Sequence, residues 1–464
     1  MSKSKNEDSE LSHTFRPSNN MHILILGSGF AGIEVLRRLQ KEFRNKKSVE
    51  ITLVSRDNFF LFTPMLHEVS TGMIETRHII TPIRTFINRA KFYEGEVQSI
   101  DLNTKELVIN HVIGKQFSPY DLHSHKLKYD YLVISLGNMT NLFEMDDIKQ
   151  QSFTMKDIDD AIILRNHVLS MLEQASIEQD DKKLRKSLLT FIVVGGGFGG
   201  VETVGGLNDF IRESVREFYK NIFMTEIRIV LVSAEDKILS EIDEELGRIA
   251  LEKLKANGVE FIMNVHANGA TQNSLKLDNG TTISSHTIIW TAGVAPEPLI
   301  KSLPCKHDKA GRIQTNSYLE VEEFPGVYAL GDCASIPNPS TGKPYPPTAQ
   351  HAIREGRIAA KNVISTIKER EEERRIGRRA RKEKFNYKTK GVMANIGNRN
   401  GVAIIFGIKI HGFIAWFLWR TFYLSNLPTA KKKLRVMIDW TMDLIFKPDV
   451  ARIKETIRFA RNEK

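Results

Sequence analysis

The sequence is poor in cysteine and contains no long apolar run. Its 464 residues include two cysteines, Cys305 and Cys333, and neither a Cys-x-x-Cys pair nor a cluster of metal ligands occurs. We therefore expect no disulfide framework and no metal site. No apolar stretch approaches the roughly 20 residues needed to span a bilayer. Residues 1–20 lack the apolar core of a signal peptide, and we expect them to form a disordered lead.

The composition is that of an ordinary globular protein with an excess of positive charge. Hydrophobic residues make up 41% and charged residues 26%, and the length predicts two or three domains. The net charge of +10 fits nucleic acid, an anionic membrane or an anionic substrate. The mixed-charge run 368–384 has no interleaved aromatic residues, which favours a solvated helix or surface insertion. We therefore predict no nucleic-acid partner.

An apolar strand pattern at 21–26 leads directly into a glycine-rich turn, G-x-G-x-x-G, and then into a helical pattern. In such a turn the first glycine permits the tight bend, the second lets a pyrophosphate approach the backbone, and the third allows close helix–strand packing. The N–H groups at the helix start then face the phosphates. The candidate binding residues are Gly27, Gly29, Phe30, Ala31 and Gly32.

The same arrangement occurs a second time. An apolar strand pattern at 191–194 is followed by a second glycine-rich turn and another helical pattern. One such turn is weak support, but two in one chain predict two dinucleotide sites in an α/β fold with two Rossmann-like domains. The second set of candidates is Gly195, Gly197, Phe198, Gly199 and Gly200.

The residue that ends the second strand of each unit is a serine. An acidic residue commonly holds the adenosine ribose at this position, whereas this chain has Ser55 and Ser233. We expect each serine to hydrogen-bond the ribose and Arg56 to lie along the adenine. The alternative is that these residues simply end a strand. No arginine directly follows Ser233, which favours NADH, with NADPH left open.

Two apolar segments that end in glycine are predicted to close the two sheets. They are 129–137, ending at Gly137, and 286–293, ending at Gly293. Val97 ends a short strand expected beside the adenine. These boundaries predict a discontinuous first dinucleotide-binding domain at 21–150 and 291–390, a second one, for NAD(P)H, at 151–290 and a C-terminal region at 391–464.

Asp332 follows a buried strand pattern at 324–334. An aspartate in this position can accept a hydrogen bond from a ribityl hydroxyl of a flavin, and beside two dinucleotide folds we favour that role. The alternative is a turn residue that caps the next helix. The apolar segment 59–72 either lines the flavin pocket or belongs to the core.

The C-terminal region combines apolar, aromatic and basic residues. Residues 412–424 are apolar nearly all round and contain two of the four tryptophans, and a basic segment follows. Next, Leu434, Ile438, Thr441 and Ile445 fall on one helical stripe. Tryptophan at an apolar–polar boundary beside lysine and arginine is typical of a helix in the membrane interface. The alternative is a helix packed against the core or a dimer partner.

Taken together, these motifs resemble the type II NADH dehydrogenases, the single-subunit NADH:quinone oxidoreductases. The resemblance extends from residue 21 to about residue 453, and its most specific parts are TAQHAIREG and the aromatic tail. It implies FAD in the first domain and NADH in the second. It also implies that a quinone reaches the flavin from the membrane side, through the C-terminal helices.

The resemblance also assigns roles to individual residues. Glu202 matches a glutamate beside the nicotinamide and flavin, and Asp332 matches the ribityl-binding aspartate. Ala349 and Gln350 match positions at the pyrimidine end of the flavin, where quinone is thought to bind. Glu202 and Gln350 are therefore the candidate catalytic residues. The chain departs from the family at Arg354, where a second glutamine is common, and at the two strand-end serines.

We accordingly predict an FAD-dependent enzyme that passes a hydride from NADH to flavin and two electrons to a membrane quinone, without pumping protons. We expect it at the cytoplasmic face of the cell membrane as a peripheral protein, with a homodimer left open. A sulfide:quinone oxidoreductase would need a cysteine pair beside the flavin, and Cys305 and Cys333 are not placed as one. A soluble ferredoxin reductase would leave the aromatic tail unexplained. A redox sensor that binds nucleic acid has only the net charge in its favour.

Overall fold

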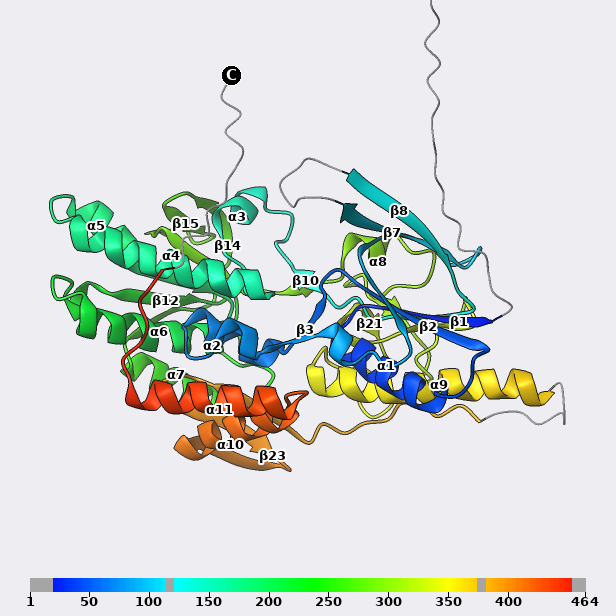
Figure 1. Ribbon diagram of the computed structural model, residues 1–464. Coiled ribbons are helices and arrows are strands. Elements are labelled where there is room, and N and C mark those ends of the chain that lie inside the picture. Colours follow the sequence, from blue (N-terminus) through cyan, green and yellow to red (C-terminus); the bar gives the residue numbers. More distant parts are fainter. Residues whose placement is uncertain (1–19, 114–120, 374–380, 453–464) are drawn as a thin grey trace, which may run out of the picture.

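The computed structural model of the protein describes residues 20–113, 121–373 and 381–452. The predicted lead, apart from residue 20, and residues 374–380 of the mixed-charge run lie outside this part. The chain forms two lobes side by side, with the C-terminal elements packed beneath the left-hand lobe and reaching the junction between the two (Figure 1). Of the helices in the described part, none is both long enough and apolar enough to cross a bilayer.

The first lobe is built on a five-stranded sheet in which every neighbouring pair is parallel. Its strand order is β20-β9-β1-β2-β5, so β1 stands between a strand that follows it directly and strands that come from later in the chain. These strands are β1 (Met21–Leu26), β2 (Val49–Ser55), β5 (Lys91–Glu94), β9 (Tyr131–Ile134) and β20 (Val327–Ala329).

The second lobe repeats this plan with four parallel strands in the order β13-β12-β11-β17. They are β11 (Thr190–Val194), β12 (Arg228–Val232), β13 (Val259–Ile262) and β17 (Thr287–Trp290). The second lobe is inserted in the chain between β9 and β20 of the first sheet. In both sheets the first strand therefore ends at the point where strand order reverses, which is where open α/β sheets bind ligands.

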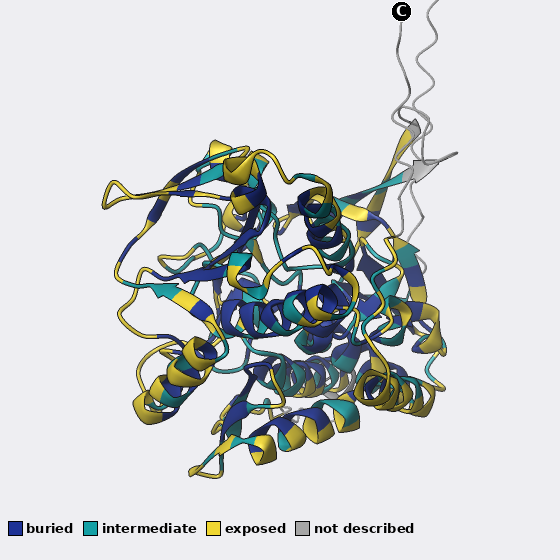
Figure 2. Ribbon diagram, turned by 90° about the vertical axis from the view of Figure 1, so that its left-hand side faces the viewer, coloured by how far each residue is buried: buried dark blue, intermediate teal, exposed yellow. Residues whose placement is uncertain are grey.

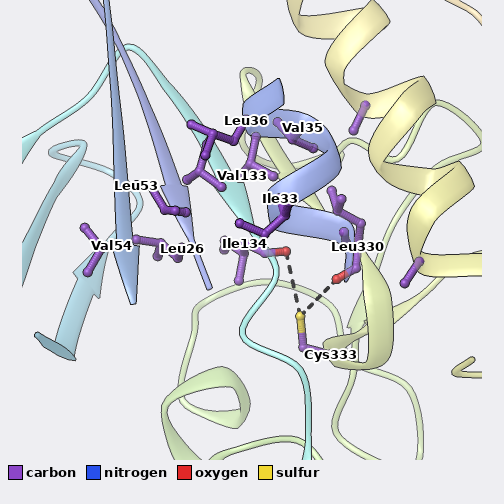
Figure 3. Close-up of a cluster of buried hydrophobic side chains, with 14 of the residues drawn as sticks. Leu26, Ile33, Val35, Leu36, Leu53, Val54, Val133, Ile134, Leu330 and Cys333 are labelled. Carbon is purple, nitrogen blue, oxygen red and sulfur yellow. Dashed lines mark hydrogen bonds between the residues drawn. The ribbon is translucent and has the colours of Figure 1, made fainter. Parts of the chain in front are cut away.

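The helices cover these sheets and bury their apolar faces (Figure 2). Figure 3 shows the core of the first lobe, where side chains of β1, β2, β9 and α1 meet. The helices are α1 (Phe30–Glu42), α2 (Leu66–Ser70), α3 (Asp146–Gln151), α4 (Ile158–Ile177), α5 (Lys182–Leu188), α6 (Phe198–Phe218), α7 (Glu244–Ala256), α8 (Pro298–Lys301) and α9 (Ala349–Glu373).

Short antiparallel strands and one short parallel pair (β19 with β21) complete the two lobes. The pair β10–β18 joins the two crossings of the chain between the lobes. These strands are β3 (Phe59–Leu61), β4 (Ile80–Pro82), β6 (Glu96–Asp101), β7 (Glu106–Ile113), β8 (Asp121–Lys128), β10 (Met139–Thr140), β14 (Ala267–Thr271), β15 (Ser274–Leu277), β16 (Thr282–Ser284), β18 (Val294–Ala295), β19 (Ile313–Gln314) and β21 (Ala334–Ser335).

The C-terminal layer consists of an antiparallel sheet and two helices. Its core residues reach both lobes, since Trp419 and Trp440 join the core of the first lobe and Ala394 and Val402 join a core of the second. The elements of this layer are β22 (Gly391–Asn395), β23 (Gly401–Ile405), β24 (Ile408–Gly412), α10 (Phe413–Asn426) and α11 (Ala430–Ile445).

One detail of the expected membrane helix is wrong. The tryptophans of α10 do not lie at an outer boundary, because Trp416 and Trp419 are 7% and 0% exposed and pack against the protein's own interior. The Trp419 indole lies between the C-terminal layer and the lobes, since it bonds to Glu202 of α6 and packs edge-on against His67 of α2. The exposed apolar residues of α10 and α11 are instead Phe, Ile, Leu and Met.

Candidate functional site

The two glycine turns have the backbone geometry that the motif requires. Gly27 lies at φ +92°, and a Cβ there would stand 2.2 Å from Ser135 O. A Cβ on Gly32 would stand 1.9 Å from Gly27 O, so α1 packs on its strand more closely than any other residue would allow. A Cβ on Gly29, in contrast, would meet nothing within 4 Å. The turn is therefore closed on the protein side and open at the helix start.

The second turn repeats this pattern. Gly195 lies at φ +124°, and a Cβ on Gly200 would stand 1.9 Å from Gly195 O. A Cβ on Gly197 or Gly199 would meet nothing within 4 Å. Both predicted dinucleotide turns thus combine tight packing against the sheet with open space at the N-terminus of the helix.

The helices that follow these turns begin without a side-chain cap. The N-cap residues of α1 and α6 are Gly29 and Gly197, and neither first turn contains an acidic residue. By contrast, α4, α5, α7 and α11 each begin with an Asp or Thr side chain that accepts a backbone N–H. The uncapped N–H groups of α1 and α6 suit a phosphate, which the helix dipole also favours.

The two strand-end serines are both buried at their predicted positions. Ser55 Oγ lies 2.8 Å from Ser28 Oγ, and Ser233 Oγ accepts a 3.1 Å hydrogen bond from the Glu235 N–H. Both hydroxyls therefore already have protein partners, and a ribose would share them. Arg56 is exposed at the end of β2 beside Asp57.

The carboxylate of Asp332 lies in a desolvated place and lacks a donor. Burial raises its pKa, and no residue in the described part of the chain donates a hydrogen bond to it. Lys156 supplies the main opposing charge. Next to it, the Gly331 N–H donates to Glu355, whose pKa burial raises to about 8. Asp332 is half-buried and has no donor among the described residues, and it lies beside the start of α1, since a Cβ on Gly331 would stand 3.7 Å from Ala31 Cβ. Such a carboxylate fits the hydroxyls of a ribityl chain, so these residues fit FAD.

The remaining predicted cofactor residues lie around the same two sheets. Phe30 packs edge-on against Phe60 and Phe62, so the segment 59–72 is in large part core. Gly137 and Gly293 both have positive φ, at +76° and +81°. The others begin a helix or lie on a strand: Ala31 on α1, Phe198 on α6, Val97 on β6 and Ala349 at the start of α9.

Glu202 lies on α6, five residues past Gly197, and its side chain points into the C-terminal layer. Its Oε1 accepts hydrogen bonds from Trp419 Nε1 at 3.1 Å and from the Asn395 N–H at 3.2 Å. Its Oε2 lies 3.9 Å from Nδ1 of His67. Burial raises the pKa of Glu202 to about 8, against the effect of both hydrogen bonds. Burial, followed by the charge of Arg420, lowers the pKa of His67 to about 3, so this histidine is neutral.

A second buried carboxylate next to this group was missed by the sequence analysis. Glu68 on α2 is fully buried, accepts a 2.8 Å hydrogen bond from Trp440 Nε1 and lies 3.6 Å from the Arg420 guanidinium. Arg420 lies between the rings of Trp416 and Trp440 and reaches Asp443 at 3.9 Å. Glu68 is more than 350 residues from Arg420 and Trp440 in sequence, so no local pattern could have revealed these contacts.

Gln350, the other candidate catalytic residue, is in the first turn of α9. Its Nε2 donates to Gly391 O at 3.2 Å, and its Oε1 accepts from the Tyr387 hydroxyl at 3.1 Å. Gly391 begins β22 and Asn395, which binds Glu202, ends it. The two candidates thus bond to opposite ends of one strand, whose end residues are roughly 13 Å apart at about 3.3 Å per residue. The structure brings them to one region without direct contact.

The two cysteines are both free and do not form a pair. Cys333 is fully buried in the core of the first lobe, with its Sγ 3.4 Å from Leu330 O and 3.7 Å from Ile134 O (Figure 3). Cys305 lies 3.9 Å from His307. A sulfide:quinone oxidoreductase that needs paired cysteines beside the flavin is therefore not supported.

Comparison with known proteins agrees with this arrangement. The profile of the pyridine nucleotide-disulphide oxidoreductase family matches residues 21–356, and that of the NDH2 C-terminal domain matches residues 389–449. The chain is 31% identical over 446 residues to the type II NADH:quinone oxidoreductase Ndh of Mycobacterium tuberculosis, covering 93% of this chain and 90% of that protein.

Two further proteins are similar over most of their length. A Dictyostelium discoideum protein named "Probable NADH dehydrogenase" is 30% identical over 434 residues, covering 93% of this chain and 91% of that protein. The solved structure of NDH2 from Plasmodium falciparum in complex with NADH superposes with a TM-score of 0.82 at 22% identity, covering 93% of this chain and all of that one. The fold and both profile matches therefore indicate one and the same protein family.

Proposed function

The chain belongs to the type II NADH:quinone oxidoreductases, and from this premise we propose how its own residues serve the reaction. It is an FAD-dependent oxidoreductase that oxidises NADH and reduces a quinone. FAD, when bound, supplies the redox chemistry, since it accepts a hydride and passes on two electrons. The protein's task is to position both substrates and to handle protons.

We propose that the first lobe holds FAD and the second NADH. The open helix start at Gly29 would take the pyrophosphate of FAD, and Asp332 would accept hydrogen bonds from its ribityl chain. The open helix start at Gly197 would take the pyrophosphate of NADH. Ser55 and Ser233 would share their hydroxyls with the adenosine riboses.

The observation that carries this proposal is the place of Glu202. It stands on the helix that begins at the second glycine turn, yet its carboxyl group binds Trp419 and Asn395 of the C-terminal layer. A buried carboxyl with a pKa raised to about 8 can hold a proton at neutral pH and release it nearby. We propose that Glu202 holds such a proton between the nicotinamide side and the quinone side, and that Gln350 contacts the quinone.

Anaerobic stopped-flow absorbance on the purified protein tests the function. We expect NADH to bleach the oxidised flavin within one fast phase, NADPH to do so more slowly, and a water-soluble quinone to restore the colour. Bleaching without recovery would contradict quinone as the acceptor. Equal rates with NADH and NADPH would contradict the preference inferred from Ser233.

We further propose that the enzyme is peripheral and attaches to a membrane through α10 and α11. Their polar side faces the protein, since Asp439 binds His78 and Asp443 lies beside Arg420, while an apolar outer face is exposed. Lys431 is exposed in the first turn of α11. Exposed apolar surface next to cations suits an anionic bilayer. The apolar outer face consists of Phe413, Ile414, Phe417, Phe422, Leu434, Met437, Ile438, Met442, Leu444, Ile445 and Phe446. The cytoplasmic leaflet remains the predicted location, and a homodimer through this face is the competing use.

Replacing Phe413 and Phe417 by aspartate should reduce binding to anionic liposomes more than about 100-fold, because burying each phenylalanine contributes about 1.5–3 kcal/mol. Cosedimentation measures the binding, and bleaching by NADH should be unchanged. Ile177→Asp is the matched control, because Ile177 is 83% exposed on α4 in the second lobe. Undiminished liposome binding by the double variant, with loss of a dimer in light scattering, would instead assign the face to a homodimer.

A further inference from the structure

The amide of Gln350 is held in one orientation by two groups that are not interchangeable. Gly391 O can only accept a hydrogen bond, so the amide nitrogen must face it, and the 3.2 Å distance from Nε2 agrees. The Tyr387 hydroxyl then donates to Oε1 at 3.1 Å. A rotated amide would bring its oxygen against the Gly391 oxygen, which is unfavourable. The observed orientation is therefore the one that satisfies both partners.

Arg354 holds Tyr387 in this place. The centre of its guanidinium lies 4.1 Å from the centroid of the Tyr387 ring, and its Nη1 donates to the main-chain oxygen of Gln350 at 2.7 Å. One cation thus contacts both members of the Tyr387–Gln350 pair. A guanidinium over a phenol ring is attractive through the ring quadrupole. The glutamine common in the family at this position could not stack in this way.

We propose that Tyr387 and Arg354 are positioning residues that hold the Gln350 amide so that it offers an N–H, rather than a carbonyl, to the quinone head group. A primary amide has two N–H groups, and Gly391 takes one. In the described part of the chain no protein acceptor takes the other. Quinone oxygens are acceptors only and gain negative charge on reduction, so a fixed N–H is the complementary group. This inference rests on the proposed function, because it requires quinone to bind at Gln350.

Tyr387→Phe removes the hydroxyl that fixes the amide and keeps the ring. The loss of one neutral hydrogen bond predicts a KM for a water-soluble quinone that rises roughly 3- to 10-fold. The Kd of the same quinone, measured by titrating the oxidised enzyme and following the flavin absorbance, should rise by a similar factor. The rate of flavin bleaching by NADH should stay at the wild-type value.

Arg354→Gln provides a second variant on a different element, and it should raise the same KM roughly 2- to 4-fold. If Arg354 orients the amide through the Tyr387 ring, and not through its own hydrogen bond to the main-chain oxygen of Gln350, the double variant should be no worse than Tyr387→Phe alone. Tyr345→Phe is the matched control. The Tyr345 hydroxyl accepts a 3.2 Å hydrogen bond from the Tyr387 N–H, so it supports the same segment without touching Gln350.

A quinone KM within 2-fold of wild type in Tyr387→Phe, with the wild type active, would overturn this inference alone. An equal rise in Tyr345→Phe would also overturn it, because loosening of the segment would then explain the effect. If the rises in KM of the two single variants multiply in the double variant, Arg354 acts independently of Tyr387, and its proposed role in holding that residue is overturned. A wild-type enzyme that is bleached by NADH but never reoxidised by quinone would instead overturn the proposed function itself.

Discussion

Replacing Gly29 by aspartate should give a folded protein that purifies without FAD, whereas Gly197→Asp should keep FAD and lose its reaction with NADH. The two positions are equivalent in the two lobes, since each is the N-cap of the helix after a glycine turn. The pair therefore tests which lobe holds which dinucleotide with one and the same chemical change.

The expected effect is large because the protein tolerates the new side chain and a phosphate does not. A Cβ at either position meets nothing within 4 Å, and both residues have φ near −70°, at −70° and −76°. Aspartate is also a favoured N-cap residue. A carboxylate about 4 Å from a phosphate costs about 4 kcal/mol at an effective dielectric constant of 20, or about a thousandfold in affinity.

Flavin absorbance of the purified variants and the KM for NADH are the measurements. The thermal midpoint of Gly29→Asp, compared with that of the wild-type apoprotein, and that of Gly197→Asp, compared with that of the FAD-bound wild type, should be equal or higher because the helices gain a cap. Loss of FAD from Gly197→Asp, with FAD retained in Gly29→Asp, would exchange the assignment of the two lobes. Retention of FAD and of a normal KM in both variants would show that neither turn binds phosphate.

Glu202→Gln should lower turnover by about a hundredfold while FAD stays bound, which is the lower end of what a positioned acid–base group contributes. Glutamine can still accept from Trp419 and Asn395, so the hydrogen bonds to the C-terminal layer are kept. Only the exchangeable proton is lost. Unchanged turnover would remove Glu202 from the reaction.

The protonation of Glu202 predicts how turnover should depend on pH. Quinone reduction takes up protons, and Glu202 carries its proton below a pKa of about 8. Turnover should therefore fall as the pH rises through about 8, and this step should vanish in Glu202→Gln. The groups near Glu202 are neutral His67 and buried Glu68 on α2, and on α10 the Trp419 indole and Tyr423, a phenol whose pKa is raised by burial and by Glu202. Arg420 on α10 acts on it through His67 and Glu68.

Stability should follow the same titration and provides a control for folding. An unfolded chain releases this proton near the ordinary value of 4.5, whereas the folded protein keeps it up to about 8. The folded state thus holds one more proton in that window, and stability falls as the pH rises through it. The Glu202→Gln variant has no such proton to release and should lack this pH-dependent destabilisation. Its thermal midpoint at pH 8 should therefore match or exceed that of the wild type.

Much of the nucleotide-binding plan could be predicted from the sequence because it depends on local features. A tight turn needs glycine at Gly27 and Gly195, and neighbouring apolar residues at 21–26 and 191–194 make the strands that precede them. The structure confirms these strands, turns and helices. The roles of Asp332, Ser55 and Ser233 toward cofactors remain predictions, although their positions at strand ends are as expected.

In the C-terminal region the sequence pattern predicts the helix faces but not what they contact. Its stripe of Leu434, Ile438 and Ile445 is apolar and exposed, as a membrane helix requires, but the tryptophans that suggested the interface are buried. Hydrophobic periodicity identifies which residues share a face of a helix. It does not say whether that face meets lipid, the protein's core or another subunit.

By itself the sequence determined the two Rossmann-like units, their glycine turns and the family, because these depend on residues that are neighbours in the chain. Only the tertiary structure decided the surroundings of Glu202 and Gln350. Asn395, Trp419 and Tyr387 reach them from the far end of the chain, and Glu68 meets Arg420 across more than 350 residues. Such contacts arise when separate lobes pack against a common layer, and burial there raises the pKa of Glu202. Since that burial is a property of the assembled fold, no stretch of sequence contains it.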